Sequence, residues 1–389
     1  MQRTIRYLAT GIVMIMICNS AQAQQALQQT LWEEGEGNYE SYRIPSIIVT
    51  TNGTLLAFAE GRKEPGDTGD IDLLLRRSFD NGKTWTDPQV VWDDGGNTCG
   101  NPNPVVDHET GRIFLFSTWN LGRDTEKEII TKTSDDTRRP YVLYSDDDGE
   151  TWSEPRELTD CCKESSWGWY ATGPGIGIQL EHGKYEGRLV IPANHSYDER
   201  DSTVYRRFED YGYGAHVLIS DDHGETWQKS EPIRPGTNES QLAELNDGTL
   251  MMNMRSYNGE YSRAVATSAD GGETWSEIEH DHQLVESQVQ ASIFNYGDYK
   301  DKMLMLFSNP AVPVGRTHMT LRASFDEGQH WAFAKLIHGG PSAYSSLARL
   351  PNGNIGLFFE AGTDSPYETM RFVSFPPDML FSEKKIGNQ

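Results

Sequence analysis

Six short hydrophobic segments recur along the chain, and each follows a turn that contains glycine or a charged residue. They cover residues 54–60, 112–118, 188–193, 249–255, 302–308 and 354–360. Short runs rich in Leu, Ile, Val and Phe, bounded by turn signals, are typical of buried β-strands. No long segment with a helical hydrophobic period competes with them. The pattern therefore predicts an all-β chain.

A second pattern, S-x-D-x-G-x-T-W, lies between these hydrophobic segments. Its copies begin at Ser78, Ser145, Ser220, Ser268 and Ser324. The last copy has His330 in place of threonine. In each copy, which we call an Asp box, the carboxylate can accept hydrogen bonds from turn amides and the glycine supplies a positive φ. The tryptophan brings a large apolar surface that can pack one hairpin end against its neighbour.

The repetition predicts stacked supersecondary units. Six hairpin units with tight turns and many short strands fit a six-bladed β-propeller of four-stranded antiparallel blades. In an antiparallel hairpin, the start of the first strand and the end of the second strand share one face. The third strand returns to the other face and carries the Asp box there. We therefore expect the Asp boxes on one face and the functional residues on the opposite face.

The N-terminus has the features of a secretory signal peptide. Two arginines precede an apolar run over residues 8–18, and Ala21-Gln22-Ala23 forms an A-x-A cleavage site. We expect residues 1–23 to be removed and residues 24–389 to form one domain that is secreted or periplasmic. The apolar run is too short to span a bilayer, so we expect no membrane span. The remaining Cys99, Cys161 and Cys162 are an odd count with an adjacent pair, which does not indicate a disulfide framework.

Composition argues against several classes of function. The formal net charge is −24 at pH 7, so nucleic acid is not an expected partner. The chain has no H-E-x-x-H motif, no paired C-x-x-C and no phosphate-binding loop in a strand-to-helix context. An Asp/Gly-rich turn could be a calcium loop, but the glycine and tryptophan of the boxes recur more regularly than ligand spacing would require. We therefore expect neither a metal nor another cofactor.

Polar residues stand at the strand ends that should share the face opposite the Asp boxes. They are Arg43, Arg62, Asp67, Glu239, Arg255, Gln290, Arg316, Tyr344 and Glu360. Taken singly, an arginine at a strand end is usually solvated, and a tyrosine there usually packs at the rim. Several arginines around one mouth, however, indicate an anion site, because guanidinium groups bind carboxylates bidentately and buried unpaired cations are costly.

This arrangement resembles that of the exo-sialidases of the bacterial and animal type. The resemblance rests on Tyr42-Arg43-Ile44-Pro45, on the repeated Asp boxes and on a Tyr–Glu couple. It extends over essentially the whole chain after residue 23. A Y-R-I-P motif together with several Asp boxes is a specific signal, whereas a single Asp box also occurs in unrelated propellers.

The resemblance implies a role for each polar residue by its position. Arg43, Arg255 and Arg316 would clamp the substrate carboxylate, with Glu360 orienting Arg43. Tyr344 would be the nucleophile, Glu239 the base that activates it, and Asp67 the general acid/base. Arg62 and Gln290 would contact the sugar ring, Asn101 would face the N-acetyl pocket, and Asn194 and His195 would lie near the glycerol chain.

A tyrosine nucleophile makes chemical sense for this substrate. Sialic acid carries a carboxylate on its anomeric carbon, which would repel a carboxylate nucleophile, and sialidases depart from the usual pair of catalytic carboxylates. A phenol with a pKa of about 10 needs a hydrogen-bonded base to attack at neutral pH, and Glu239 can supply it. Asp67 would protonate the leaving oxygen, and for that we expect its pKa to be raised.

The resemblance thus predicts an exo-α-sialidase that hydrolyses terminal α-linked sialic acid from sialylated glycans with retention, through a tyrosyl-enzyme intermediate. A trans-sialidase, an intramolecular enzyme that forms an anhydro product, and a hydrolase for another nonulosonic acid remain open, because they would share these residues. A non-catalytic propeller that binds glycans or peptides fits less well. It would lack the tyrosine, the glutamate or the aspartate, and all three are present.

Overall fold

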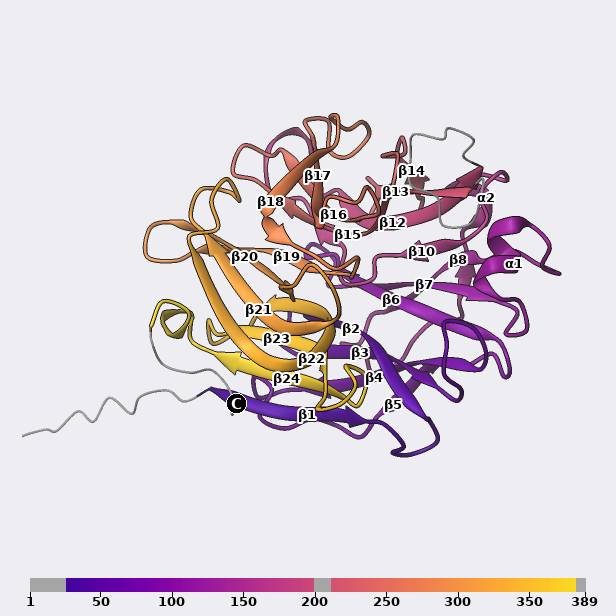
Figure 1. Cartoon of the computed structure of the whole chain (residues 1–389), viewed down its shortest axis with the longest axis horizontal. Helices are drawn as coiled ribbons and strands as arrows, with labels where there is room; N and C mark the ends of the chain where they lie inside the picture. The colour runs from indigo at the N-terminus through magenta and orange to yellow at the C-terminus, as the bar shows by residue number, and fades with distance from the viewer. Residues whose placement is uncertain (1–25, 199–210, 383–389) are drawn as a thin grey trace, which may run out of the picture.

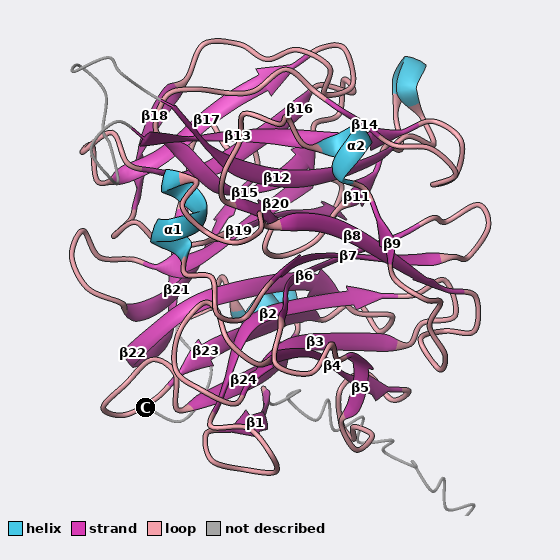
Figure 2. Ribbon diagram, turned by 90° about the vertical axis from the view of Figure 1, so that its right-hand side faces the viewer, coloured by secondary structure: helices cyan, strands magenta, loops and turns pink. Residues whose placement is uncertain are grey.

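The computed structural model describes residues 26–198 and 211–382, and within these ranges the regular secondary structure is almost entirely β-strand (Figures 1 and 2). The prediction of an all-β chain is confirmed. The described residues add two short helices that the sequence did not predict, α1 (Glu126–Thr131) and α2 (Thr159–Cys162), and two 3₁₀ turns. The expected leader, residues 1–23, lies outside the described ranges.

The strands form four hydrogen-bonded sheets that follow one another around the molecule (Figure 1). The first contains β2 (Ser41–Val49), β3 (Leu55–Arg62), β4 (Ile71–Ser78), β5 (Gln89–Trp92), β6 (Thr98–Val106), β7 (Ile113–Asn120), β8 (Arg139–Ser145) and β9 (Arg156–Glu157). The second contains β10 (Tyr170–Thr172), β11 (Ile178–Gln179), β12 (Leu189–Asp198), β13 (Tyr211–Ser220) and β14 (Gln228–Lys229).

The third sheet contains β15 (Thr237–Glu244), β16 (Leu250–Ser256), β17 (Ser262–Ser268) and β18 (Glu279–Val285). The fourth contains β19 (Ser292–Asp298), β20 (Met303–Pro310), β21 (Thr317–Ser324), β22 (Phe333–Arg349), β23 (Ile355–Ala361), β24 (Thr369–Phe375) and β1 (Leu27–Glu33). Among the described strands, consecutive neighbours pair antiparallel, and the one parallel contact joins β4 to β6.

The six hydrophobic segments predicted from sequence are β3, β7, β12, β16, β20 and β23, and each strand begins one residue after the predicted start. That first residue still belongs to the preceding turn. The segments are buried because both of their faces are covered by neighbouring strands; β3, for example, is buried at every position. Continuous apolar runs of this kind therefore marked strands with no solvent-exposed face.

The two ends of the described chain meet in one sheet. β1 pairs antiparallel with β24, from Leu27 opposite Ser374 to Glu33 opposite Thr369. In Figure 1 the indigo strand β1 lies beside the yellow strand β24. The long strand β22 serves two neighbours, since its first part pairs with β21 and its last part, from Ser342, pairs with β23. This closure brings the last strands of the chain next to β2.

Each Asp box makes the same set of internal hydrogen bonds. In the first box, Ser78 Oγ donates to Asp80 and accepts from the Gly82 amide at 2.9 Å, while Asp80 accepts from the amide and the hydroxyl of Thr84 at 2.9 and 2.7 Å. In the fifth box, His330 replaces the threonine with its own amide at 2.9 Å and its Nδ1 at 2.7 Å from Asp326. The departure at His330 therefore preserves the hydrogen-bonding pattern of the turn.

The box tryptophans pack against a neighbouring hairpin, as the sequence predicted. The Trp85 ring lies 5.2 Å from that of Phe372 on β24, and the Trp227 ring lies 4.7 Å from that of Phe116 on β7. Both contacts have edge-to-face geometry, which aromatic pairs prefer. These boxes thus join their own hairpins to their neighbours through aromatic contacts.

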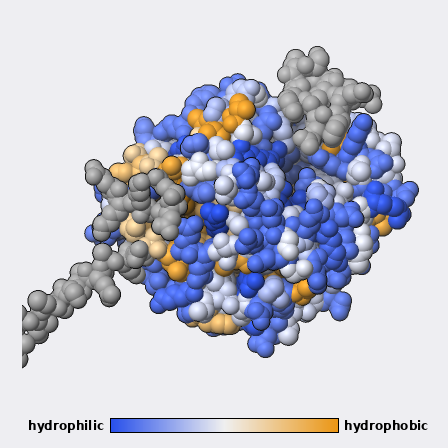
Figure 3. Space-filling model, turned by 60° about the horizontal axis from the view of Figure 1, so that its bottom comes forward, coloured by the Kyte–Doolittle hydropathy of each residue, from blue (hydrophilic) through white to orange (hydrophobic). Residues whose placement is uncertain are grey.

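The outer surface is mostly polar, in keeping with the acidic composition. Figure 3 shows a largely hydrophilic face with a few separate hydrophobic patches. No helix within the described ranges has the length and apolar character needed to cross a bilayer. The three cysteines that remain after residue 23 are free thiols, and Cys99 and Cys162 are buried.

We predict that Gly82→Ala destabilises the protein far more than Gly259→Ala. Both glycines have a left-handed backbone, with φ of 82° and 81°. A Cβ on Gly82 would lie 2.2 Å from the ring of Phe372, whereas a Cβ on Gly259 would meet nothing within 4 Å. We expect the free energy of unfolding to fall by about 3 kcal/mol for Gly82→Ala and by about 1 kcal/mol for the Gly259→Ala control. Urea denaturation measures both, and equal losses would contradict the packing role of this box.

Candidate active site

A cavity of about 350 Å³ opens where the first strands of the hairpins begin and the second strands end. Nine of the residues singled out from sequence line it: Arg43, Arg62, Asp67, Asn101, Asn194, Glu239, Arg255, Arg316 and Tyr344. A larger cavity of about 650 Å³ lies at the other ends of the inner strands, near Thr50, Glu244 and Arg349. The smaller cavity combines a tyrosine, carboxylates and arginines from several strands, so we take it as the candidate active site.

Irregularities in the inner strands aim these side chains at the cavity. The antiparallel register shifts between Arg43 and Ser46 on β2, Gly100 and Asn103 on β6, Thr237 and Ser240 on β15, and Ser342 and Ser345 on β22. Ile44 and Asn101 also adopt positive φ values of 61° and 55°. A bulge bends a strand and redirects its side chains. At each of these places the bulge turns toward the cavity a residue that would otherwise continue the regular ladder.

Tyr344, Glu239 and Arg255 form a hydrogen-bonded group at one wall of the cavity. The Tyr344 hydroxyl donates to Glu239 Oε1 at 2.5 Å, and Arg255 Nη1 donates to Glu239 Oε2 at 2.6 Å and to the Tyr344 oxygen at 3.3 Å. Burial, reinforced by the charge of Glu239, raises the pKa of Tyr344 well above 10, although the surrounding arginines act in the opposite direction. The phenol is therefore neutral at pH 7, with a carboxylate in place to take its proton.

Glu360 holds Arg43 and the backbone beside Tyr344. Its fully buried carboxylate accepts from Arg43 Nε at 2.7 Å, from Arg43 Nη2 at 3.4 Å, and from the amides of Ile44 and Tyr344 at 2.9 and 3.0 Å. Hydrogen bonds of this kind to an ionised acceptor are stronger than neutral ones. Glu360 therefore orients Arg43, as the resemblance implied, and in addition joins β2 to β22.

Arg316 lies across the cavity mouth without a carboxylate partner among the described residues. Its Nη1 donates to the Tyr367 hydroxyl at 2.6 Å, and the Tyr367 ring lies 4.1 Å from the Arg43 guanidinium. Tyr367 was not predicted from sequence, because it stands in a polar loop with no strand pattern. The three arginines face one volume, and an anion bound there would meet cations that protein carboxylates only partly neutralise.

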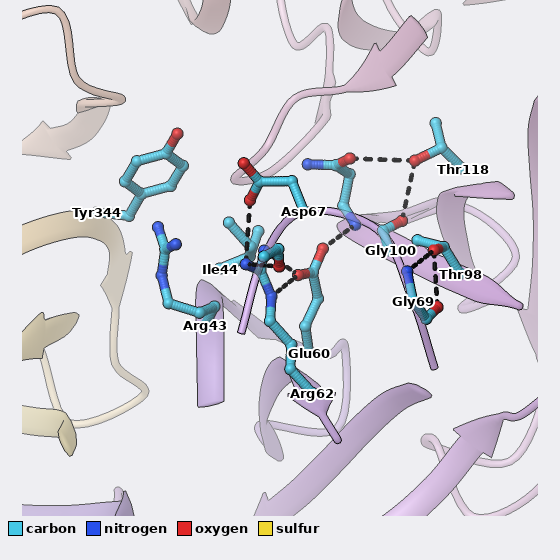
Figure 4. Close-up of polar contacts among 12 residues, drawn as sticks. Arg43, Ile44, Glu60, Arg62, Asp67, Gly69, Thr98, Gly100, Thr118 and Tyr344 are labelled. Carbon is cyan, nitrogen blue, oxygen red and sulfur yellow. Dashed lines mark hydrogen bonds and ion pairs between the residues drawn. The ribbon is translucent and has the colours of Figure 1, made fainter. Parts of the chain in front are cut away.

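Asp67 lies opposite, in the loop after β3, and forms an ion pair with Arg62. Arg62 Nη1 is 3.0 Å from Asp67 Oδ1, while its Nε and Nη2 donate to Glu60 at 2.8 and 2.5 Å. Figure 4 shows Arg62 bonded to Glu60 on one side and to Asp67 on the other, with the Asp67 carboxylate turned toward the side where Tyr344 lies.

The raised pKa expected for Asp67 is not found. Burial would raise it, but the positive charges of Arg62 and Arg43 outweigh burial and lower the pKa of Asp67 to about 2. The side chain is 63% exposed, so water screens part of these charges. In the free protein Asp67 is therefore an ionised carboxylate at neutral pH, and it can act as an acid only if a bound ligand displaces water or changes its contact with Arg62.

Asn101 presents a fixed hydrogen-bond donor to the cavity. Its Oδ1 accepts from Arg138 Nη2 at 2.6 Å and from Thr118 Oγ1 at 3.1 Å, which leaves the Nδ2 group as the free end of the amide. Its backbone amide donates to Glu60 Oε1 at 2.7 Å. Glu60 and Arg138 were not predicted as site residues. The only signal for Glu60 was its acidic side chain at the end of a hydrophobic strand.

Two predicted ligand contacts lie outside the cavity lining. Gln290 is 1% exposed, and its amide bonds both backbone groups of Ser345 at 3.0 Å. His195 is fully buried, stacks on Trp167 at 3.5 Å and accepts from Arg234 at 2.6 Å. Their polar atoms are used within the protein, so we do not retain them as ligand contacts. The adjacent Asn194 does line the cavity. Within the described ranges no group of three or more potential metal ligands is found.

We predict that Glu360→Gln lowers the free energy of unfolding by about 3–5 kcal/mol, because it leaves the buried Arg43 without its counter-ion. The carboxamide also presents a donor to groups that are themselves donors. Asp135→Asn is a suitable control, because its ion pair with Arg123 is 70% exposed on the aspartate side, and we expect a loss below about 1 kcal/mol. Denaturant titration of both variants tests this, and similar losses would remove Glu360 from its structural role.

Comparison with known proteins identifies the family. The BNR repeat-like domain family matches residues 53–357. The chain is 34% identical to a sialidase from Micromonospora viridifaciens over 87% of this chain and 53% of that protein, so it spans about half the length of that relative. It is 31% identical to an exo-alpha-sialidase from Aspergillus fumigatus, over 83% of this chain and 79% of that protein.

A solved sialidase structure is also similar to this chain. The Hadza microbial sialidase Hz136 superposes with a TM-score of 0.80 at 30% identity, covering 91% of this chain and 69% of that one. The chain therefore belongs to the sialidase family of BNR-repeat proteins.

Proposed function

We propose that the protein is a retaining exo-α-sialidase that removes terminal α-linked sialic acid from sialylated glycans through a tyrosyl-enzyme intermediate. The observation that carries this proposal is the 2.5 Å hydrogen bond from the Tyr344 hydroxyl to Glu239, in a cavity that also contains Arg43, Arg255 and Arg316. A buried phenol paired with a carboxylate and facing three arginines fits a substrate that carries an anion next to its reacting carbon.

The arginines would hold the substrate carboxylate. Arg43 is neutralised on one side by Glu360 and Arg255 by Glu239, while Arg316 pairs with no carboxylate among the described residues. An incoming carboxylate would complete the charge balance. It would also fix the anomeric carbon near the Tyr344 oxygen, because the Arg43 and Arg316 guanidinium groups lie 5.2 and 5.6 Å from the Tyr344 ring. Positioning of this kind converts binding energy into correct orientation.

In the first step, the Tyr344 oxygen attacks the anomeric carbon while its proton passes to Glu239. The glycosidic bond breaks, and Asp67 gives a proton to the departing oxygen. In the second step, Asp67 takes a proton from water and the water oxygen attacks the anomeric carbon. The bond from that carbon to the Tyr344 oxygen breaks, and Glu239 returns the proton to the departing Tyr344 oxygen. Two displacements at one carbon give net retention.

Asp67 must be protonated for the first step although its pKa is about 2 in the free protein. A glycan over the exposed side chain would exclude water and disfavour the charged form. Hydroxyl groups of the sugar could also take the place of Asp67 on Arg62. We therefore propose that substrate binding itself raises the pKa of Asp67.

We further propose that the strands form six four-stranded blades of a propeller. The strand orders support this, because the seven-stranded sheet divides at β22 into β19–β22 and β22–β24 with β1, and the eight-stranded sheet divides between β5 and β6. We also propose that the A-x-A sequence at residues 21–23 is cleaved and that the protein is secreted or periplasmic.

The proposal can be tested by NMR of the purified protein acting on sialyllactose in the presence of EDTA. We expect free sialic acid to appear first as the α-anomer and to convert later to the β-anomer. Immediate appearance of the β-anomer would contradict retention. Transfer to added labelled lactose, or formation of an anhydro sugar, would instead show a trans-sialidase or an intramolecular enzyme.

We predict that Tyr344→Phe lowers kcat by about 10³-fold or more, since it removes the nucleophilic oxygen and keeps the ring. Tyr296→Phe is the matched control, because Tyr296 is also buried but lies outside the cavity lining, where its hydroxyl donates to the backbone oxygen of Gly353 at 2.6 Å. We expect its kcat to change by less than about twofold. Steady-state rates on sialyllactose, with thermal unfolding as a check on folding, measure both. Near-normal turnover of Tyr344→Phe would exclude Tyr344 as the nucleophile.

A further inference from the structure

Glu60 lies on the side of the cavity that carries Asp67, although neither of the two displacement steps uses it. It is 2% exposed and lies at the end of β3. Its carboxylate accepts from Arg62 Nε and Nη2 at 2.8 and 2.5 Å and from the backbone amide of Asn101 at 2.7 Å. A buried carboxylate with this many donors holds each of them in a fixed position.

The surroundings of Glu60 contain more positive than negative buried charge. Arg138 is 2% exposed and forms no ion pair within the described ranges; it donates to the Asn101, Asn120 and Thr118 side chains. A Cβ placed on Gly100 would lie 2.7 Å from Glu60 Oε1 and 3.3 Å from Arg138 Nη2, so the two charged groups are close neighbours. One buried carboxylate therefore faces two buried guanidinium groups, those of Arg62 and Arg138.

Both of these arginines also hold the loop that carries Asp67. Arg62 Nη1 donates to the backbone oxygen of Gly66 and to Asp67 Oδ1, and Arg138 Nη1 donates to the backbone oxygen of Asp67 at 3.4 Å. The same loop is tied to β6, where Thr98 Oγ1 bonds both backbone groups of Gly69 at 3.1 and 2.9 Å (Figure 4). The position and the charge environment of Asp67 therefore both depend on groups that Glu60 holds.

The same device occurs once more in the cavity. Glu360, at the end of β23, accepts from Arg43 and from the amide of Ile44, whose φ is 61°. Glu60, at the end of β3, accepts from Arg62 and from the amide of Asn101, whose φ is 55°. In each case a buried glutamate near the end of the second strand of a hairpin fixes an arginine. It also accepts from the amide of a residue with positive φ on the first strand of the following hairpin. Glu360 lies on the side of the cavity that carries Tyr344, and Glu60 occupies the equivalent place on the side that carries Asp67.

We propose that Glu60 is a positioning residue that holds Arg62 and offsets the charge of Arg62 and Arg138, and thereby keeps Asp67 able to be protonated when substrate is bound. This inference rests on the proposed role of Asp67 as acid/base. Without the Glu60 charge, Asp67 would be the nearest anion to two buried cations. Its carboxylate would then stay ionised and bound to Arg62, and it would donate a proton to the leaving oxygen less readily.

The charged and titratable groups around Asp67 come from several elements. They are Arg43 on β2, Glu60 and Arg62 on β3, Glu126 on α1, Arg138 before β8, Tyr213 on β13, Glu239 on β15, Arg255 on β16, Tyr257 after β16, Arg316 before β21, Tyr344 on β22 and Tyr367 before β24. Of these, only Glu60 contacts Arg62 and also lies beside Arg138.

The test compares two leaving groups in the Glu60→Gln variant. The 4-nitrophenolate group of an aryl sialoside departs with little need for a proton, whereas the sugar that leaves sialyllactose needs one. If Asp67 becomes harder to protonate by about one pKa unit, the basic limb of the kcat–pH profile on sialyllactose should move about one unit lower. The loss of kcat should then be about tenfold greater on sialyllactose than on the aryl sialoside at pH 7.

Glu286→Gln is the matched control. Glu286 is 1% exposed, pairs with Arg263 at 2.6 Å and accepts from the amide of Ser256 at 2.7 Å, but it does not line the cavity. Its loss should lower stability without moving the basic limb or the ratio of the two rates. Glu60→Asp, which keeps the charge, should leave the limb near its wild-type position.

The outcomes separate this inference from the proposed function. If the wild-type protein has no basic limb on sialyllactose, or if Asp67→Asn keeps it, the role of Asp67 fails. If that limb depends on Asp67 but Glu60→Gln leaves it unmoved and slows both substrates equally, Glu60 has only a structural role. Should Glu60→Gln not fold, Arg138→Gln tests the same charge balance in the opposite direction. It should move the limb to higher pH, and an unmoved limb would overturn the inference.

Discussion

The buried carboxylate of Glu360 connects the last strands of the chain to the first inner strand, and one wall of the candidate active site depends on that connection. It accepts from Arg43 and the Ile44 amide on β2 and from the Tyr344 amide on β22. These groups meet where β2 packs against β22 and β23, beside the sheet that β1 completes by pairing with β24. A fully buried charge requires such donors, since its removal from water is costly. The requirement therefore holds Arg43 and Tyr344 in one geometry.

Backbone irregularity is concentrated in the strands around the candidate active site. The ladders are regular along most of β3, β7 and β23, while the inner strands shift register at Arg43, Asn101, Glu239 and Tyr344. Ile44 is β-branched and has a positive φ, which is unfavourable for such a residue. Buried glutamates compensate by accepting the amides that these bulges release from the ladder. The strain is thus held by the same charges that orient the arginines.

Arginines are concentrated in one cavity although the whole chain is acidic. The whole chain carries a net charge of −24, yet five arginines line one cavity of about 350 Å³. An acidic surface would repel an acidic glycan at long range, and salt screens that repulsion beyond about 10 Å. The arginines act at short range. Glu360, Glu60, Asp67 and Glu239 pair with Arg43, Arg62 and Arg255, whereas Arg316 has no carboxylate partner among the described residues. The arrangement is compatible with the anionic ligand proposed above.

The sequence by itself determined the features that depend on neighbours in the chain. The hydrophobic runs and turns located β3, β7, β12, β16, β20 and β23 to within one residue at their starts, and the Asp boxes form the bonds that their spacing predicts. The alternating direction of the strands also predicted that most of the polar strand ends lie at one cavity, because antiparallel pairing fixes which ends share a face.

Only the tertiary structure decided the features that arise between distant segments. Glu60, Arg138 and Tyr367 enter the site through contacts with residues far away in sequence, and the acidic side chain of Glu60 at the end of a hydrophobic strand was the only local signal among them. Gln290 and His195 were expected at the ligand, but neighbouring strands use their polar atoms. The pKa of Asp67 is lowered to about 2, contrary to the expected rise, because it depends on arginines from three separate segments. Charge interactions act through space, and their sum is set by the fold.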